Sequence, residues 1–199
     1  MAVDTDDVDD TETWRMIFQE TRLQDVYLLS PERKSDARGY FARTWCIHEA
    51  QRRGVMRNWV QCSVSFNHLA GTLRGMHLQS VPHAEAKLVR CTRGMIFDVA
   101  VDLRPKSATY CQWFGTELSE DNGRQLFIPE GVAHGFLTLA DASEVYYQIS
   151  EFYEAESAIG IRWDDPAIGI QWPCAVRVIH PRDSHFPDFK PSFASEEVR

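Results

Sequence analysis

Ionisable side chains gather among apolar neighbours in residues 72–90, TLRGMHLQSVPHAEAKLVR. If the first part of this segment is extended, His77 and Gln79 point the same way, because side chains alternate along a strand. A hairpin-like connection around Pro82 could bring Lys87 onto the same concave face as His77. An imidazole and an ammonium group placed together suit the removal of a proton beside a carbonyl group.

Two later motifs add candidates for the same site. IPEGVAHGF places His134 at the end of a P-x-G-x-x-H pattern, and SEVYYQI offers Tyr147. The three groups His77, Lys87 and Tyr147 fit one reaction class. The imidazole removes a proton α to a carbonyl, the ammonium stabilises the enolate oxygen, and the phenol returns a proton. Reprotonation from the opposite face inverts the carbon, and no redox cofactor is needed.

A metal site is the competing interpretation of these histidines. P-x-G-x-x-H is similar to the second half of the cupin motif, whose metal-binding members pair it with H-x-H. The position two after His77 is Gln79, and an amide oxygen is a poor replacement for imidazole on a transition metal. His83 and Glu85 lie in a Pro-containing loop, out of register. We therefore expect no bound metal, and a metal-dependent cupin enzyme stays open as an alternative.

Short segments rich in β-forming residues must position these groups. Residues 95–103 alternate, so that Met95, Phe97, Val99, Val101 and Leu103 share a face. Turn signals separate the segments at short intervals, which is typical of a β-sandwich or barrel. One helix is expected over residues 46–56, and residues 180–192 are expected to pack as an irregular arm. The other expected strands cover residues 59–65, 111–118, 125–129, 134–139 and 143–149.

Composition fits one globular domain of 199 residues, 44% of them hydrophobic. We expect an acidic flexible tail over residues 1–14, a single domain over 15–190 and a C-terminal tail over 191–199. The net charge of −8 and the lack of a basic run argue against a nucleic-acid partner. No apolar run is long enough to span a membrane. Five scattered cysteines without a C-x-x-C pair favour a reducing cytoplasm.

Seven blocks between about Arg38 and about Pro173 resemble the dTDP-4-dehydrorhamnose 3,5-epimerase family, in family order. The blocks are ARGYF, TLRGMHLQ, AKLVRCTRG, DVAVDLR, QLFIPEGVAHGF, EVYYQ and WDDPAIGIQWP. The resemblance implies a predominantly β fold, a cupin-type jelly roll with a few short helices. It also implies a homodimer with strand exchange at the N-terminal part, a nucleotide-linked 4-keto-6-deoxyhexose as substrate, and no cofactor.

The resemblance also assigns roles to residues. His77 matches the base, Asp183 its carboxylate partner, and Lys87 the group near the C4 oxygen. Tyr147, three residues after Glu144, matches the acid, and its neighbour Tyr146 would then face the other way. The substrate-binding positions are Arg38 and Arg74 for the diphosphate, His134 for the sugar, and Gln61 and Tyr153 for the nucleotide.

Two departures from the family pattern concern substrate binding. Arg43 stands where many members carry a Glu that contacts thymine, and Ser63 stands where many carry Asn. A carboxylate accepts a hydrogen bond from a base N–H, whereas a guanidinium can only donate. The nucleotide base, cytosine for example, and the choice of C3, C5 or both carbons therefore stay open. A binding protein without catalytic activity is a further alternative, which the set of His77, Lys87 and Tyr147 disfavours.

Overall fold

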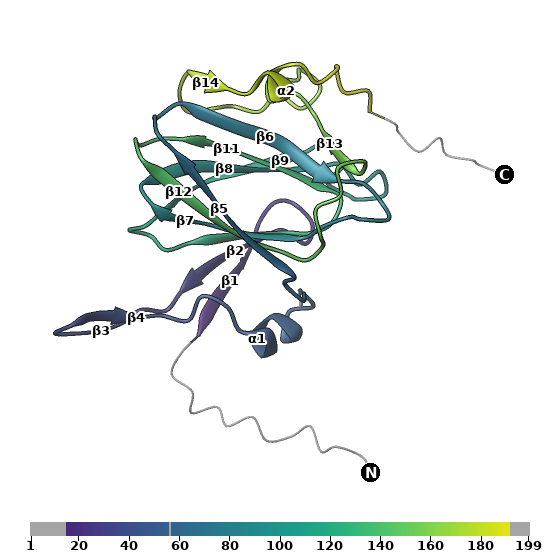
Figure 1. The fold of residues 1–199 in the computed structure, drawn as a ribbon. Helices are drawn as coiled ribbons and strands as arrows, with labels where there is room; N and C mark the ends of the chain where they lie inside the picture. The colour runs from purple at the N-terminus through teal and green to yellow at the C-terminus, as the bar shows by residue number, and fades with distance from the viewer. Residues whose placement is uncertain (1–14, 56, 192–199) are drawn as a thin grey trace, which may run out of the picture.

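The computed structural model describes residues 15–55 and 57–191, and its main feature is a pair of facing β-sheets (Figure 1). The first sheet runs β1 (Met16–Glu20), β2 (Tyr27–Pro31), β10 (Gln125–Ile128), β7 (Lys87–Arg93), β12 (Ser143–Ile149) and β5 (Gln61–Asn67). The second runs β13 (Ala158–Gly160), β6 (Thr72–Gln79), β11 (Val132–Thr138), β8 (Met95–Asp102) and β9 (Trp113–Ser119). A short parallel strand, β14 (Val178–Ile179), pairs with β6. This arrangement is the predicted jelly-roll sandwich.

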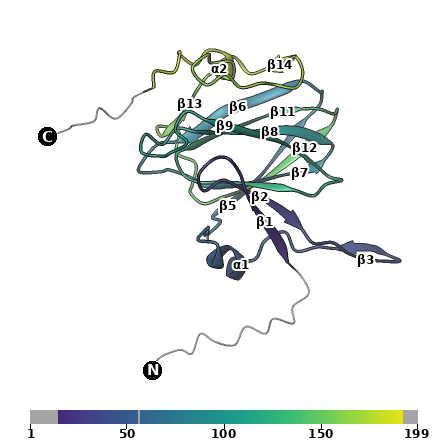
Figure 2. The ribbon, with the colours of Figure 1, turned by 180° about the vertical axis from the view of Figure 1, so that it is seen from behind.

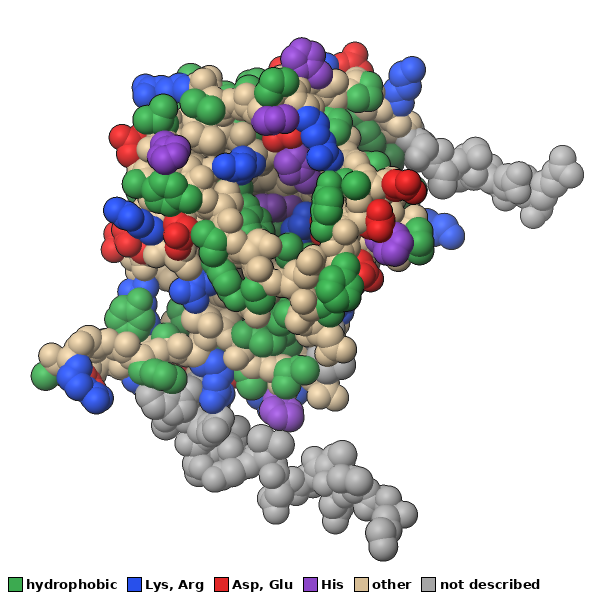
Figure 3. Space-filling model, in the orientation of Figure 1, with side chains coloured by type: hydrophobic (Ala, Val, Ile, Leu, Met, Phe, Trp, Pro, Cys, Tyr) green, Lys and Arg blue, Asp and Glu red, His purple; other side chains and the backbone are tan. Residues whose placement is uncertain are grey.

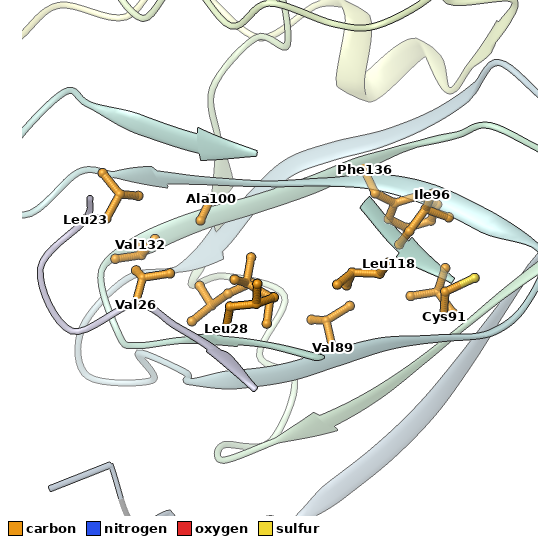
Figure 4. Packing of buried hydrophobic residues seen from close by; sticks show 13 residues of the cluster. Leu23, Val26, Leu28, Val89, Cys91, Ile96, Ala100, Leu118, Val132 and Phe136 are labelled. Atoms are coloured by element: carbon orange, nitrogen blue, oxygen red, sulfur yellow. The ribbon is translucent and has the colours of Figure 1, made fainter. Parts of the chain in front are cut away.

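The main core lies between the two sheets and draws residues from both (Figure 4). Strand β8 shows how the layers are built. Ile96 and Ala100 point into this core, while Val99 and Val101 pack on the outer side against a second cluster that includes Ile161. The predicted alternation along β8 is therefore confirmed, but both of its faces are buried. The second face avoids water because the chain after β13 folds back over it.

Element boundaries follow the sequence prediction closely in the second half of the chain and less closely in the first. Strand β12 covers the predicted residues 143–149, whereas the strand predicted at 59–65 is observed two residues later, as β5. The helix predicted over 46–56 is shorter, as α1 (Ile47–Arg52), and residue 56 lies outside the described residues. Strands β1 and β2 were not predicted. The arm expected to be irregular, residues 180–192, contains a single helical turn, α2 (Pro181–Ser184), and β14 directly precedes it.

A hairpin of β3 (Lys34–Asp36) and β4 (Gly39–Phe41) projects from the body of the molecule (Figures 1 and 2). It extends from the end of β2, well away from α2 and β14 on the far side of the sandwich. The predicted acidic tail, 1–14, and all but the first residue of the predicted C-terminal tail lie outside the described residues. Among the described residues, no helix combines the length and apolarity that crossing a bilayer requires.

Candidate active site

A pocket of about 840 Å³ opens between the two sheets, at the side where β5 forms the edge of the first sheet and β6 belongs to the second. Strands β5, β7 and β12 of the first sheet line one side, and β6 and β11 of the second sheet line the other. The segment from Val178 to Asp183 forms part of the rim. Figure 3 shows the hollow, with histidine and basic side chains gathered in and around it. Eight of the ten predicted site residues lie here: His77, Asp183, Lys87, Tyr147, Gln61, Arg74, His134 and Tyr153.

His77 is held by the predicted carboxylate partner. Its Nε2 lies 2.7 Å from Oδ1 of Asp183, and the backbone N–H of Gly75 donates to the other carboxylate oxygen at 3.1 Å. An ionised carboxylate only accepts hydrogen bonds, so Nε2 carries the hydrogen and Nδ1 keeps its lone pair. The predicted pairing is present, and it leaves one ring nitrogen available to accept a proton.

The charge state of Asp183 suits this arrangement. Burial on its own would raise the pKa of Asp183, and the side chain is only 6% exposed. The hydrogen bond with His77, the charge of that imidazole and the N–H of Gly75 outweigh burial, so the pKa lies below its ordinary value of 3.8. Asp183 is therefore ionised throughout the neutral range and can steady a protonated His77.

A second imidazole in the pocket has its own buried carboxylate. His134 Nε2 lies 2.7 Å from Oδ1 of Asp98, and both side chains are almost completely buried. The registers of β6 and β11 place His134 directly opposite His77. The ring centroid of His134 is 5.9 Å from that of Tyr147, edge to face. This contact fixes both rings at the wall of the pocket.

Tyr147 enters the pocket from the sheet opposite His77. It lies on β12 and lines the pocket, whereas Tyr146 does not, so strand parity selects Tyr147 as predicted. Burial raises the pKa of Tyr147 well above its ordinary value of 10.0, and the charge of Asp98 adds to the effect. The phenol therefore keeps its proton at neutral pH, as a proton donor must.

Polar side chains near the opening are arranged by neighbouring strands. Arg74 Nε donates to Asn67 Oδ1 at 2.8 Å, which aims the guanidinium of this exposed residue along the pocket edge. Gln61 Oε1 accepts from the backbone N–H of Tyr153 at 3.0 Å, which ties the segment after β12 to β5. A fixed guanidinium fork suits phosphate oxygens.

Gln79, the residue that breaks the metal motif, has a structural role. Its amide donates to the carbonyls of His83 and Phe152 at 2.9 and 3.1 Å and accepts from the N–H of Glu154 at 2.6 Å. It thereby joins the loop after β6 to the segment after β12. Within the described residues, no three His, Cys, Asp or Glu side chains are grouped as a metal site would require.

Arg38 and Arg43 do not line the pocket of their own chain. Arg38 lies in the β3–β4 turn, where its side chain is 90% exposed and pairs with Asp36. Arg43 lies after β4, 3.4 Å from the carboxylate of Glu49. A substrate-binding role for either residue therefore requires the predicted second subunit.

Two acids near the reactive groups were not assigned by sequence reasoning. Asp98 was given no functional role, and Glu85 was considered only beside His83 as a possible metal ligand. In the structure Asp98 supports His134, and Glu85 lies 2.7 Å from Lys87 Nζ. For Glu85 a signal existed, because residues two apart on an extended segment share a face. Asp98 gave no such signal, because its partner His134 is 36 residues away in the sequence.

The fold and the site together define an all-β sandwich whose pocket is equipped for acid–base chemistry. The family model of dTDP-4-dehydrorhamnose 3,5-epimerase matches residues 20–191. A dTDP-4-dehydrorhamnose 3,5-epimerase from Sinorhizobium fredii is 43% identical over 178 residues, 89% of this chain and 91% of the relative. A dTDP-4-dehydrorhamnose 3-epimerase from Streptomyces niveus is 35% identical over 162 residues, 81% of this chain and 78% of the relative.

A solved structure is similar over the whole sandwich. The crystal structure of dTDP-4-dehydrorhamnose 3,5-epimerase from Bacillus anthracis, with TDP and PPi bound, superposes with a TM-score of 0.85. The sequences are 39% identical, and the match covers 88% of this chain and all of that one. The chain belongs to the dTDP-4-dehydrorhamnose 3,5-epimerase family, whose members are carbohydrate epimerases of the isomerase class. The predicted cupin-type jelly roll is confirmed by the same comparison.

Proposed function

We propose that this chain epimerises a nucleotide-linked 4-keto-6-deoxyhexose, with dTDP-4-dehydro-6-deoxyglucose as the default substrate and dTDP-4-dehydrorhamnose as the product. One observation carries the proposal. His77 on β6 and Tyr147 on β12 reach the same pocket from opposite sheets, and Lys87 lines it from β7, the strand beside β12. A substrate bound there has a base on one side and a proton donor on the other.

The reaction needs three groups of this chain. His77 Nδ1 takes the proton from the carbon beside the ketone, and the electron pair moves onto the ketone oxygen as an enolate. The ammonium of Lys87 stabilises that negative oxygen. Tyr147 then delivers a proton to the opposite face of the same carbon, and the carbon is inverted. Asp183 stabilises the imidazolium of His77 during the enolate stage.

Binding of the nucleotide is assigned to the pocket edge. Arg74 offers forked donors to the diphosphate, Gln61 and Tyr153 border the nucleotide, and His134 shapes the sugar end. The Bacillus anthracis relative binds TDP, which supports thymine as the base. We further propose a homodimer, in which Arg38 and Arg43 of one subunit serve the pocket of the other, and a cytoplasmic location, which the five free cysteines favour.

Solvent exchange tests the proposal directly. In deuterated buffer, the enzyme should incorporate deuterium beside the ketone of the dTDP-ketosugar, at C3, at C5 or at both, as followed by NMR. His77→Ala should lower exchange by roughly 10²–10⁴-fold. Tyr147→Phe should slow inversion by a similar factor while His77 still exchanges the proton it removes. The absence of exchange with any 4-ketosugar nucleotide would refute the proposal.

The same spectra distinguish the second candidate. The 3-epimerase from Streptomyces niveus is a relative at 35% identity, so inversion of C3 alone is a specific alternative. Deuterium at C3 with none at C5, together with a product inverted only at C3, would identify a single-carbon epimerase. Deuterium and inversion at both carbons would support the default reaction.

A further inference from the structure

Each reactive nitrogen of the pocket is paired with one acid. His77 pairs with Asp183 and His134 with Asp98, whereas the partner of Lys87 is Glu85, at 2.7 Å. Glu85 lines the pocket, and the reaction as described makes no use of it. Within the described residues, Glu85 is the one acid in contact with the Lys87 ammonium. The side chains of Glu85 and Lys87 are only 10% and 11% exposed.

The backbone on both sides of Glu85 is held firmly. Ala86 N–H donates to Ser150 Oγ at 2.8 Å, and Ser150 N–H donates to the carbonyl of Ala86 at 3.0 Å. On the other side, Gln79 binds the carbonyl of His83 at 2.9 Å. The Glu85 carboxylate is therefore presented from a loop that is fixed before substrate arrives, which is the property expected of a supporting residue.

A buried ion pair of this kind is a weak source of stability, because removing both charges from water offsets much of their attraction. The ion pair has a more direct effect on the position of the Lys87 ammonium. A lysine side chain has a flexible stem, and its ammonium offers three donors but no acceptor. A carboxylate at 2.7 Å fixes the ammonium in one place and occupies one donor, which leaves the other two for a ketone oxygen.

We propose that Glu85 is a positioning residue that holds the Lys87 ammonium where the enolate oxygen develops. The inference rests on the proposed function, because it assumes that Lys87 stabilises an enolate. Glu85 acts through Lys87 and does not touch the substrate. Its loss should therefore slow the chemical step and leave binding of the nucleotide nearly unchanged, since nucleotide binding is assigned to other residues.

Glu85→Ala tests the inference. We expect kcat for epimerisation to fall by roughly 10–100-fold, the range for a misplaced catalytic group, with KM and the Kd for TDP changed less than about 3-fold. Glu85→Gln keeps an acceptor oxygen, so its kcat should fall less than that of Glu85→Ala. Glu117→Ala, an exposed residue of β9 outside the pocket, is the matched control and should behave as wild type.

A double-mutant cycle separates positioning from a structural role. In a Lys87→Met background, with exchange followed at high enzyme concentration, Glu85→Ala should cause almost no further loss of rate. Additive losses in the cycle would overturn the inference, as would wild-type kcat in Glu85→Ala. If Glu85→Ala does not fold, the same comparison is made with Glu85→Gln. A wild-type enzyme with no exchange activity refutes the proposed function instead, so the two failures are distinguishable.

Discussion

His77 presents only one of its ring nitrogens to the pocket, because the other faces Asp183. At the scale of single residues, the carboxylate thus decides which ring nitrogen can accept a proton from the pocket. It also links catalysis to stability, since the same hydrogen bond joins α2 to β6 across 106 positions of sequence. Changing Asp183 should therefore lower both the catalytic rate and the free energy of unfolding.

Asp183→Asn should lower kcat by roughly 10²–10⁴-fold, because the imidazolium loses its negative partner. It should also cost about 1–3 kcal/mol of unfolding free energy near pH 7. Since the folded-state pKa of Asp183 is lowered, its contribution to stability is fully present above the ordinary value of 3.8 and is lost as pH falls below it. Urea unfolding at pH 7 and pH 3 measures this, and a wild-type advantage that does not shrink in acid would contradict it.

At the scale of elements, the close approach of β6 and β11 sets His77 opposite His134. The register shifts between His134 and Phe136, where Gly135 lies against β6. A Cβ at Gly135 would meet Met76 Sδ at 2.6 Å and the carbonyl oxygen of Arg74 at 2.8 Å. A glycine is required here because the backbone of the facing strand has no room to move aside.

Gly135→Ala should separate the two strands and move both histidines. We expect a loss of about 1–3 kcal/mol in unfolding free energy, as for other overpacked core positions. Turnover should fall together with stability, because a small displacement of a catalytic group is costly. Denaturant unfolding and steady-state kinetics on one preparation provide the measurement. Wild-type values in both would show that the strands tolerate the methyl group.

At the scale of the whole molecule, the β3–β4 hairpin and the segment just after it carry Arg38 and Arg43, predicted binding residues that do not line the pocket of their own chain. Tyr40 and Phe41 are 57% and 63% exposed, and the hairpin projects from the sandwich (Figure 1). Apolar side chains on a projecting hairpin are typical of a surface that a second subunit covers. The proposed dimer would bring Arg38 and Arg43 to the neighbouring pocket.

Subunit complementation tests that arrangement. Arg38→Ala and His77→Ala should each be impaired alone. After co-expression, a mixed dimer should contain one site with intact Arg38 and His77, if these residues come from different subunits. Activity on the order of a quarter of wild type is expected for random pairing. No recovery, in a preparation shown to contain mixed dimers, would place both residues at the site of one subunit. Wild-type activity of Arg38→Ala alone would exclude Arg38 from the site.

Much of the site could be predicted from the sequence because short motifs, a few residues long, identify its side chains. His77, Lys87 and Tyr147 were identified from short blocks, and alternation distinguishes Tyr147 from Tyr146 once the strand is recognised. Strands between 95 and 149 were predicted because turn residues punctuate them at short intervals. Strands β1 and β2 were missed. They join the sheet through the pairing of β2 with β10, about a hundred residues further along the chain, which leaves no periodic signal.

The sequence by itself determined the chemical groups and the family, because motif spacing preserves residue type and order. Tertiary structure alone decided that Asp98, 36 residues from His134 in sequence, is the acid that pairs with it. It also decided that both faces of β8 are buried and that Arg38 lies outside its own pocket. The physical reason is that charge pairing and burial depend on distances in space, which the order of residues along the chain does not encode directly.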